Sequence, residues 1–173
     1  MQKYIKYLSI ENKSKYGEIN TPFELINKIL DKLPQTIFED STKKWLDPGA
    51  GQGYFSIMVY NRLFEGLKSK FKCPIERKEY IITHMLYIVE INKDHLIHLR
   101  EVFDHPKANI YNINYLDLRI NTMYPELASI KFDVIIGNPP YNANGLIKVP
   151  TNKTKQKQDD GQVLWRDFIN ISL

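Results

Sequence analysis

The sequence contains a single cysteine, Cys73, among its 173 residues. One thiol rules out an internal disulfide, so we expect the protein to reside in a reducing compartment, the cytoplasm. Long apolar runs are also missing, and no run approaches the roughly 20 residues that a membrane span requires. The first 17 residues lack the continuous apolar segment of a signal peptide. We therefore expect no membrane among its partners.

The sequence also lacks a large excess of charge of either sign. The 24 basic and 20 acidic residues give a formal net charge of +4 and a pI near 9.0. This mild excess permits a nucleic-acid partner without establishing one. The apolar content of 43% and charged content of 25% are ordinary for a globular protein. The length fits one domain, so we predict a single domain over residues 1–173.

The spacing of apolar residues predicts strands that alternate with helices. Strands are predicted over residues 43–47, 85–90, 109–114 and 131–137, and helices over residues 22–33, 54–64, 76–84, 92–103 and 162–173. Thr21 is the expected N-cap of the first helix, with Glu24 completing a capping box. Residues 66–79 are basic and read mainly as a surface loop. The alternation predicts an α/β fold, a parallel sheet with helices on both faces.

A glycine-rich turn follows the first predicted strand, with the sequence Asp47-Pro-Gly49-Ala-Gly51-Gln-Gly53. Glycines at alternate positions allow the backbone to turn tightly and to approach a ligand closely. No Gly-Lys-Ser/Thr follows, so the turn is not a P-loop. The carboxylate of Asp47 suits a cationic ligand group better than a phosphate. A tight strand-to-helix turn without a ligand is the structural alternative.

Carboxylates also follow the second and third predicted strands. Glu90 stands where a carboxylate can accept hydrogen bonds from two ribose hydroxyls. Asp117 follows the third strand and is suited to accept a hydrogen bond from an adenine amino group. Each has a structural alternative: Glu90 as a surface residue at a strand end, and Asp117 as a loop-capping residue.

The fourth predicted strand runs into Asn138-Pro139-Pro140-Tyr141. Asn138 offers a carbonyl acceptor, and the Pro139 carbonyl is a second acceptor on a residue that has no N–H of its own. Together these two oxygens can hold an amino group by both of its hydrogens. Tyr141 offers a flat face on which a base can stack. The alternative is a rigid turn after a strand.

With these four segments in this order, the chain resembles the class I S-adenosylmethionine-dependent methyltransferases. Within them it is similar to the adenine-N6 DNA methyltransferases of type II and IIG restriction–modification systems, in their gamma arrangement. There a Tyr-Gly-Glu-x-x-Thr-Pro motif precedes the glycine turn, as residues 16–22 do here. The resemblance extends from about Tyr16 to Leu173. It implies a Rossmann-like fold that is truncated after about four strands, without the later strands and the target-recognition domain.

The resemblance implies S-adenosyl-L-methionine as cofactor, no metal, and a role for each motif residue. Thr21 would bind the methionine carboxylate, Asp47 and the backbone near Gly49 its amino end, and Glu90 the ribose. Ile91 and Leu118 would flank the cofactor's adenine, and Asp117 would accept from its amine. The complete implied cofactor set is Tyr16, Thr21, Pro22, Asp47, Gly49, Gly51, Gly53, Glu90, Ile91, Asp117 and Leu118. The implied catalytic set is Asn138, Pro139, Pro140 and Tyr141, which would grip a flipped-out adenine.

The implied partner is double-stranded DNA, together with a fused or separate target-recognition and endonuclease module. Residues 148, 153, 155 and 157 are lysines that follow the catalytic motif, and they are either a solvated loop or phosphate contacts. Three other functions stay open. They are a methyltransferase for protein glutamine N5, an RNA base methyltransferase, and a non-catalytic cofactor-binding fragment.

Overall fold

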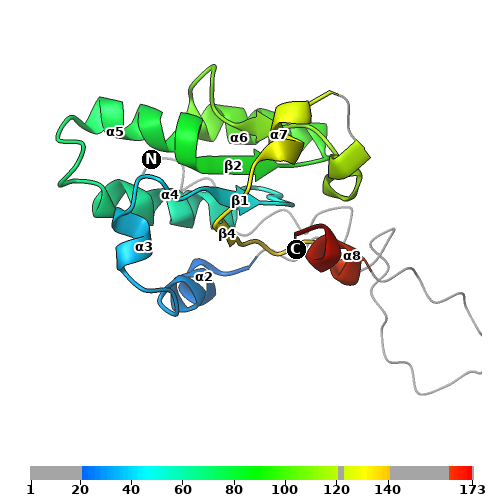
Figure 1. The fold of residues 1–173 in the computed structure, drawn as a ribbon, viewed down its shortest axis with the longest axis horizontal. Helices are drawn as coiled ribbons and strands as arrows, with labels where there is room; N and C mark the ends of the chain where they lie inside the picture. Colours follow the sequence, from blue (N-terminus) through cyan, green and yellow to red (C-terminus); the bar gives the residue numbers. More distant parts are fainter. Residues whose placement is uncertain (1–20, 121–122, 141–163, 173) are drawn as a thin grey trace, which may run out of the picture.

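A computed structural model describes residues 21–120, 123–140 and 164–172 of the chain. At its centre lies one sheet of four strands in the order β3-β2-β1-β4 (Figure 1). The strands are β1 (Trp45–Asp47), β2 (Leu86–Val89), β3 (Ile110–Tyr111) and β4 (Val134–Ile135). All neighbouring strands pair in parallel. The predicted α/β architecture with a parallel sheet is therefore confirmed.

Helices precede the first strand, connect successive strands, as parallel pairing requires, and follow the last strand. They are α2 (Phe23–Leu30), α3 (Thr36–Glu39), α4 (Tyr54–Gly66), α5 (Pro74–Tyr80), α6 (Lys93–Phe103), α7 (Pro125–Ser129) and α8 (Trp165–Ser172). A π-helix, η1 (Ile81–Met85), continues α5, and a 3₁₀-helix, η2 (Tyr115–Ile120), follows β3. Among the described residues, no helix combines the length and hydrophobicity needed to cross a bilayer.

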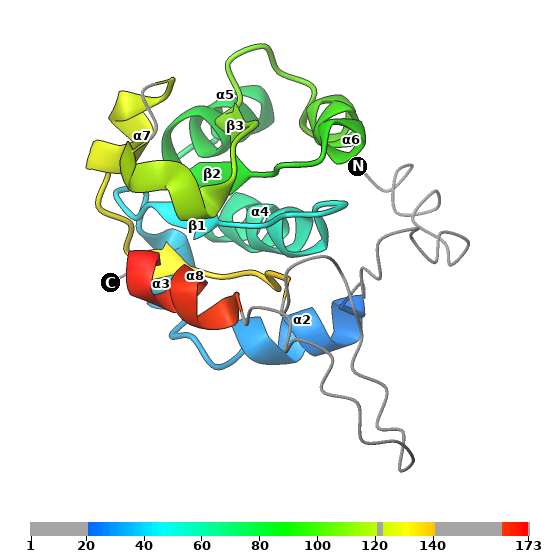
Figure 2. The same ribbon diagram turned by 90° about the vertical axis from the view of Figure 1, so that its right-hand side faces the viewer.

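Two hydrophobic clusters cover the two faces of the sheet, because successive strand side chains point to opposite sides. Trp45 and Ile88 face a cluster that includes residues of α2, α4, η1 and α6. Leu46 and Tyr87 face the other cluster, which includes Leu127 of α7 and Phe168 of α8. Figure 2 shows α4 and α6 on one side of the sheet and α7 and α8 on the other. The strands are nearly encased, which fits their continuous apolar sequences.

The start of the first helix differs from the prediction. Helix α2 begins at Phe23 with Pro22 as its N-cap, and no side chain caps it. Glu24 pairs with Lys28 one turn later, at 2.8 Å, instead of closing a capping box. The prediction of Thr21 as N-cap was therefore wrong, and the Thr21 hydroxyl has another partner, described below.

The segment between α4 and β2 is more ordered than its basic composition indicated. Helix α5 starts at Pro74, inside the range predicted as loop, and η1 carries the chain to β2. Arg77 is 4% exposed; its guanidinium lies 4.2 Å from the centre of the Phe64 ring and donates to the Phe64 carbonyl at 3.1 Å. The sequence pattern indicates an exposed residue at Arg77, because the Phe64 ring and carbonyl that surround it lie 13 residues earlier in the chain.

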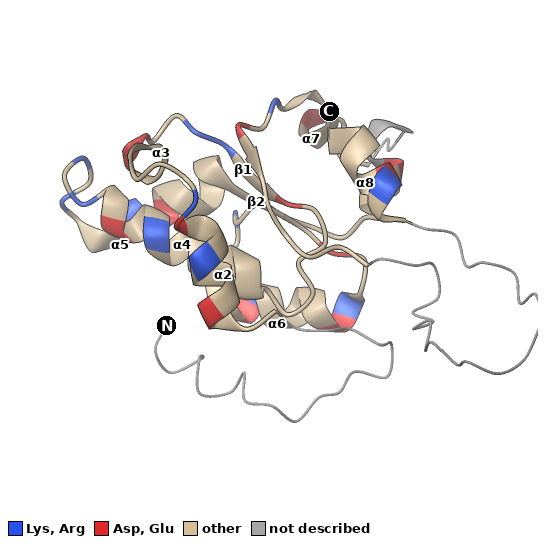
Figure 3. Cartoon of the chain, turned by 90° about the horizontal axis from the view of Figure 1, so that it is seen from below, with Lys and Arg blue, Asp and Glu red and all other residues tan. Residues whose placement is uncertain are grey.

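Charged residues of both signs alternate along the outer helices. Lys or Arg stands beside Asp or Glu on α2, α5 and α8 (Figure 3). The helices drawn there thus present mixed rather than purely basic surfaces. The predicted DNA-contacting lysines at 148, 153, 155 and 157 lie outside the described residues.

Candidate functional site

The carboxyl ends of β1, β2 and β4 bring the predicted motifs to one edge of the sheet. β2 and β3 lie on one side of β1, and β4 lies on the other. The chain runs outward from β1 to β2 and β3 and then returns to β4 on the other side of β1. The strand order therefore reverses at β1, which opens a crevice beyond its carboxyl end. Ligands of open α/β sheets bind in such a crevice. Asp47 ends β1, and Glu90 and Asn138 follow β2 and β4 at this crevice.

The glycine turn is fastened to the end of β2. The Ala50 amide donates to the Val89 carbonyl at 3.0 Å, and the Gly51 amide donates to Glu90 Oε2 at 2.6 Å. Gly51 has a φ of +54°, and no atom lies within 4 Å of the place where its side chain would be. The turn thus presents bare backbone to open space beside a carboxylate, as close approach of a ligand requires.

Gly53 has a structural task at the end of the same turn. Its φ is +86°, and a β-carbon there would lie 2.5 Å from Leu99 Cδ2. The glycine thus allows α4 to start in contact with α6. Gly53 was predicted to help bind the cofactor. In the structure, the close packing of α4 against α6 accounts for a glycine at this position.

Glu90 is 6% exposed, and its carboxylate is held by backbone N–H groups on both sides. Oε1 accepts from the Asn92 amide at 2.7 Å, opposite the Gly51 bond to Oε2. Each carboxylate oxygen has a second lone pair, so a vicinal diol can still donate to this group. Asn112, which the sequence analysis did not identify, donates to the Glu90 and Ile91 carbonyls at 2.9 and 3.0 Å. Ile91 is 65% exposed next to this fixed carboxylate.

Asp47 ends β1 with a buried carboxyl group. Its Oδ2 accepts from the Ser56 hydroxyl at 2.7 Å, whereas Oδ1 accepts from none of the described residues. Burial raises the pKa of Asp47 to about 7, and the charge of Glu90 adds to the rise. A side chain at Gly137 would place its β-carbon 2.7 Å from Oδ1, so the glycine leaves room beside this oxygen. A buried acidic oxygen without a partner among the described residues suits a cationic group.

Ser56 is a further residue that sequence analysis missed. It is fully buried on α4, three residues after Gly53, and it supplies the hydroxyl that orients Asp47. A serine on an apolar helix face is a weak signal, because buried serines also bond to their own helix backbone. Only its distance to Asp47 reveals the role.

The Asn-Pro-Pro segment lies against the glycine turn. A β-carbon on Gly49 would be 3.6 Å from Pro139 Cα and 3.8 Å from Pro140 Cδ. The Asn138 side chain donates from Nδ2 to the Thr21 hydroxyl at 3.1 Å. Predicted residues from three distant segments, at Thr21, Gly49 and Asn138, are thus brought together.

Asp117 lies in η2, after β3, and is exposed. Its Oδ2 accepts from Asn114 at 3.1 Å, and its amide bonds to the Asn114 carbonyl at 3.0 Å. Leu118 is the next residue of the same short helix. This geometry is that of a loop carboxylate at the edge of the site. Tyr16 and Tyr141, which were predicted to bind the cofactor and to stack on a base, lie outside the described residues.

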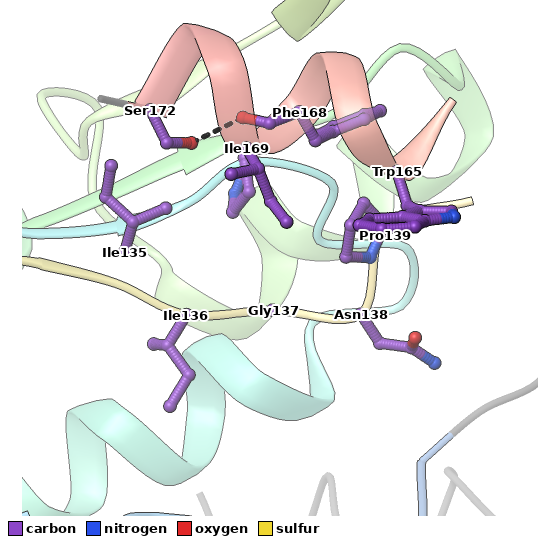
Figure 4. Close-up of a pocket in the computed structure, with 10 residues that line it drawn as sticks. Ile135, Ile136, Gly137, Asn138, Pro139, Trp165, Phe168, Ile169 and Ser172 are labelled. Carbon is purple, nitrogen blue, oxygen red and sulfur yellow. Dashed lines mark hydrogen bonds between the residues drawn. The ribbon is translucent and has the colours of Figure 1, made fainter. Parts of the chain in front are cut away.

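An apolar pocket of about 450 Å³ lies between the end of β4 and α8. Ile135 and Pro139 form one wall, and Trp165, Phe168 and Ile169 contribute from α8 (Figure 4). Figure 4 also shows the Asn138 amide pointing away from α8. The pocket therefore lies behind the amide, on the side opposite to its polar end. Among the described residues, no cluster of side chains suits a metal ion.

Comparison with known proteins decides the family. The model of the Eco57I restriction-modification methylase family matches residues 58–173, about two thirds of the chain. The chain belongs to this family. This is a family of restriction–modification DNA methylases, and membership implies S-adenosylmethionine as methyl donor. The matched range includes Glu90, Asp117 and the Asn-Pro-Pro-Tyr motif but begins after the glycine turn.

A solved structure supports the fold of this chain. The chain is similar to a modification subunit of a putative type I restriction enzyme from Vibrio vulnificus YJ016, with a TM-score of 0.51 and 19% identity. The match covers 82% of this chain and 27% of that subunit, so the chain spans about a quarter of the subunit's length. No sequence among the curated proteins matches the chain.

Proposed function

We propose that this methylase domain transfers a methyl group from S-adenosyl-L-methionine to N6 of an adenine in double-stranded DNA. The observation that carries the proposal is the juxtaposition of the Asn-Pro-Pro segment with the glycine turn, where Pro139 Cα lies 3.6 Å from the β-carbon position of Gly49. Two carbonyl acceptors for an amino group thus stand beside a crevice suited to a cofactor. An exocyclic amine of a base is a target that such acceptors fit.

The cofactor's two ends are assigned to the two halves of the crevice. Asp47 holds the methionine ammonium, because its buried Oδ1 accepts from no described residue. Glu90 accepts from the ribose hydroxyls, and exposed Ile91 lies against the adenine ring. Asp117 accepts from the cofactor's amine, with Leu118 as its neighbour in η2. Tyr16, Thr21 and Pro22 complete the methionine side.

The target adenine is assigned to the Asn-Pro-Pro-Tyr motif. Its N6 hydrogens bond to Asn138 Oδ1 and the Pro139 carbonyl, Pro140 keeps the loop rigid, and Tyr141 stacks on the ring. Bonding to both hydrogens favours tetrahedral geometry at N6 and frees its lone pair. When bound, S-adenosyl-L-methionine would supply a methyl group on a sulfonium. Breaking of its C–S bond would balance formation of the N–C bond, and one N6 proton would then leave to water. The adenine must leave the duplex to reach this position.

The cofactor assignment predicts that Glu90→Gln weakens binding of S-adenosylhomocysteine by about 10- to 100-fold. Loss of a charged acceptor for two hydroxyl donors has this magnitude. Isothermal titration calorimetry measures it, with Glu76→Gln on the exposed side of α5 as the matched control. Unchanged affinity in Glu90→Gln, with the fold intact by circular dichroism, would remove the assignment.

The reaction is tested by mapping methylated adenines in DNA from a host that expresses the protein and lacks other adenine methylases. We expect N6-methyladenine at one recurring sequence. Asn138→Ala is expected to abolish the signal while leaving the affinity for S-adenosylhomocysteine within about threefold. DNA in which only cytosines carry new methyl groups would contradict the adenine assignment.

A further inference from the structure

The hydrogen bond between Asn138 and Thr21 joins the catalytic loop to the start of the described chain. Asn138 Nδ2 donates to Thr21 Oγ1 at 3.1 Å, across 117 residues of sequence. Both side chains are half-buried. The sequence alone does not predict that these two side chains meet, and this contact was not among the predictions.

Thr21 is held in place by helix α2, which is anchored on α4. Phe23 stacks on Tyr54 with ring centroids 4.8 Å apart. Arg62 of α4 donates to Asp31 at 2.6 Å and to Asn27 at 3.1 Å. The Thr21 hydroxyl is therefore presented from the start of α2, whereas Asn138 follows β4.

The direction of this hydrogen bond determines which end of the amide faces the crevice. The terminal torsion of asparagine is broad and nearly two-fold, so an unrestrained amide readily exchanges its oxygen and nitrogen ends. Only the amide oxygen can accept a hydrogen bond from an amine. The amide NH₂ group is itself a donor and would face the hydrogens of the amine without bonding to them. When Nδ2 donates to Thr21, Oδ1 turns away from Thr21 and becomes the presented end.

We propose that Thr21 is a positioning residue that holds the Asn138 amide with its oxygen toward the target amine. This inference rests on the proposed function and adds a role to Thr21 beyond contact with the cofactor. A carboxylate at the methionine end only accepts hydrogen bonds, so the Thr21 hydroxyl would donate its hydrogen bond to it. The hydroxyl oxygen then serves as acceptor for Asn138, and cofactor binding reinforces the productive orientation of the amide.

The test compares Thr21→Val, which removes the hydroxyl at nearly constant shape, with Thr21→Ser, which retains it. We expect kcat for methylation of unmethylated phage DNA to fall about tenfold in Thr21→Val. We expect the serine variant to recover kcat to within about threefold. The dissociation constant for S-adenosylhomocysteine is expected to change less than kcat does. Wild-type kcat in both variants, or a loss confined to cofactor affinity, would overturn the positioning role.

A second readout separates this inference from the proposed function. In protein labelled with ¹⁵N at asparagine, the Asn138 side-chain signals are assigned by their disappearance in Asn138→Asp. We expect these signals to shift in Thr21→Val and to stay near their wild-type positions in Thr21→Ser. If wild-type protein leaves adenine unmethylated, the proposed function fails while these spectra still decide the contact. Unshifted signals in Thr21→Val overturn the inference alone.

Discussion

Asp47 gives the site a pH dependence that is set by one residue. Burial holds its pKa at about 7, so the group is mostly protonated at lower pH. A cationic ammonium requires the ionised carboxylate, so binding must expel the proton below pH 7. We expect the affinity for S-adenosylhomocysteine to fall roughly tenfold from pH 7 to pH 5.5, with release of about one proton at pH 6. Calorimetry in buffers of different ionisation enthalpy measures both quantities.

Asp47→Asn is the control for this linkage, because it keeps the shape of the side chain and removes the titration. The variant is expected to bind more weakly at pH 7 and to show a flat affinity between pH 5.5 and 7. Ser56 retains a side-chain oxygen to donate to at the same position. A wild-type affinity that does not vary over this pH range would contradict the role of Asp47 as the ammonium ligand.

At the scale of elements, the site depends on how closely β4 approaches the end of β1. A β-carbon at Gly137 would lie 2.7 Å from Asp47 Oδ1 and 3.2 Å from Pro48 Cδ. Gly137→Ala is therefore expected to lower the free energy of unfolding by about 1–3 kcal/mol, as overpacking does. Gly49→Ala is the matched control, because its β-carbon meets Pro139 at an ordinary 3.6 Å and its cost is expected below about 1 kcal/mol. Urea unfolding compares the two, and equal losses would contradict the close-approach explanation.

Elements with strong periodicity were predictable, and those shaped by packing were not. Helices α4 and α6 and strands β1 and β2 lie where the apolar patterns indicated. β3 extends over only Ile110–Tyr111, shorter than predicted, and η2 and α7 follow it without a periodic signal. The residue types of the site were visible at strand ends, whereas the contacts of Thr21 and Ser56 required the folded chain. Sequence shows which groups can react, but the fold decides which of them meet.

At the scale of the whole molecule, the proposed cofactor site bridges the two halves of the sheet. The methionine end is assigned to the end of β1, next to β4 in the sheet, and the adenosine end to the ends of β2 and β3. Each half is stabilised by its own contacts to the glycine turn, through Val89 on one side and Pro139 on the other. A ligand that binds only at the methionine end or only at the adenosine end makes no contact with the other half of the crevice.

This bridging predicts that S-adenosylhomocysteine raises the Tm by more than adenosine and methionine together at matched concentrations. Joining the two ends makes the second contact intramolecular, so a single binding event supplies both. At about 100 times its dissociation constant, the joined ligand adds about 2.7 kcal/mol to the free energy of unfolding. This corresponds to roughly 5–10 °C for a chain of this size. Differential scanning fluorimetry makes the comparison, with Glu90→Gln expected to reduce the shift. A shift from adenosine alone as large as that from the joined ligand would show that the methionine half of the crevice contributes nothing.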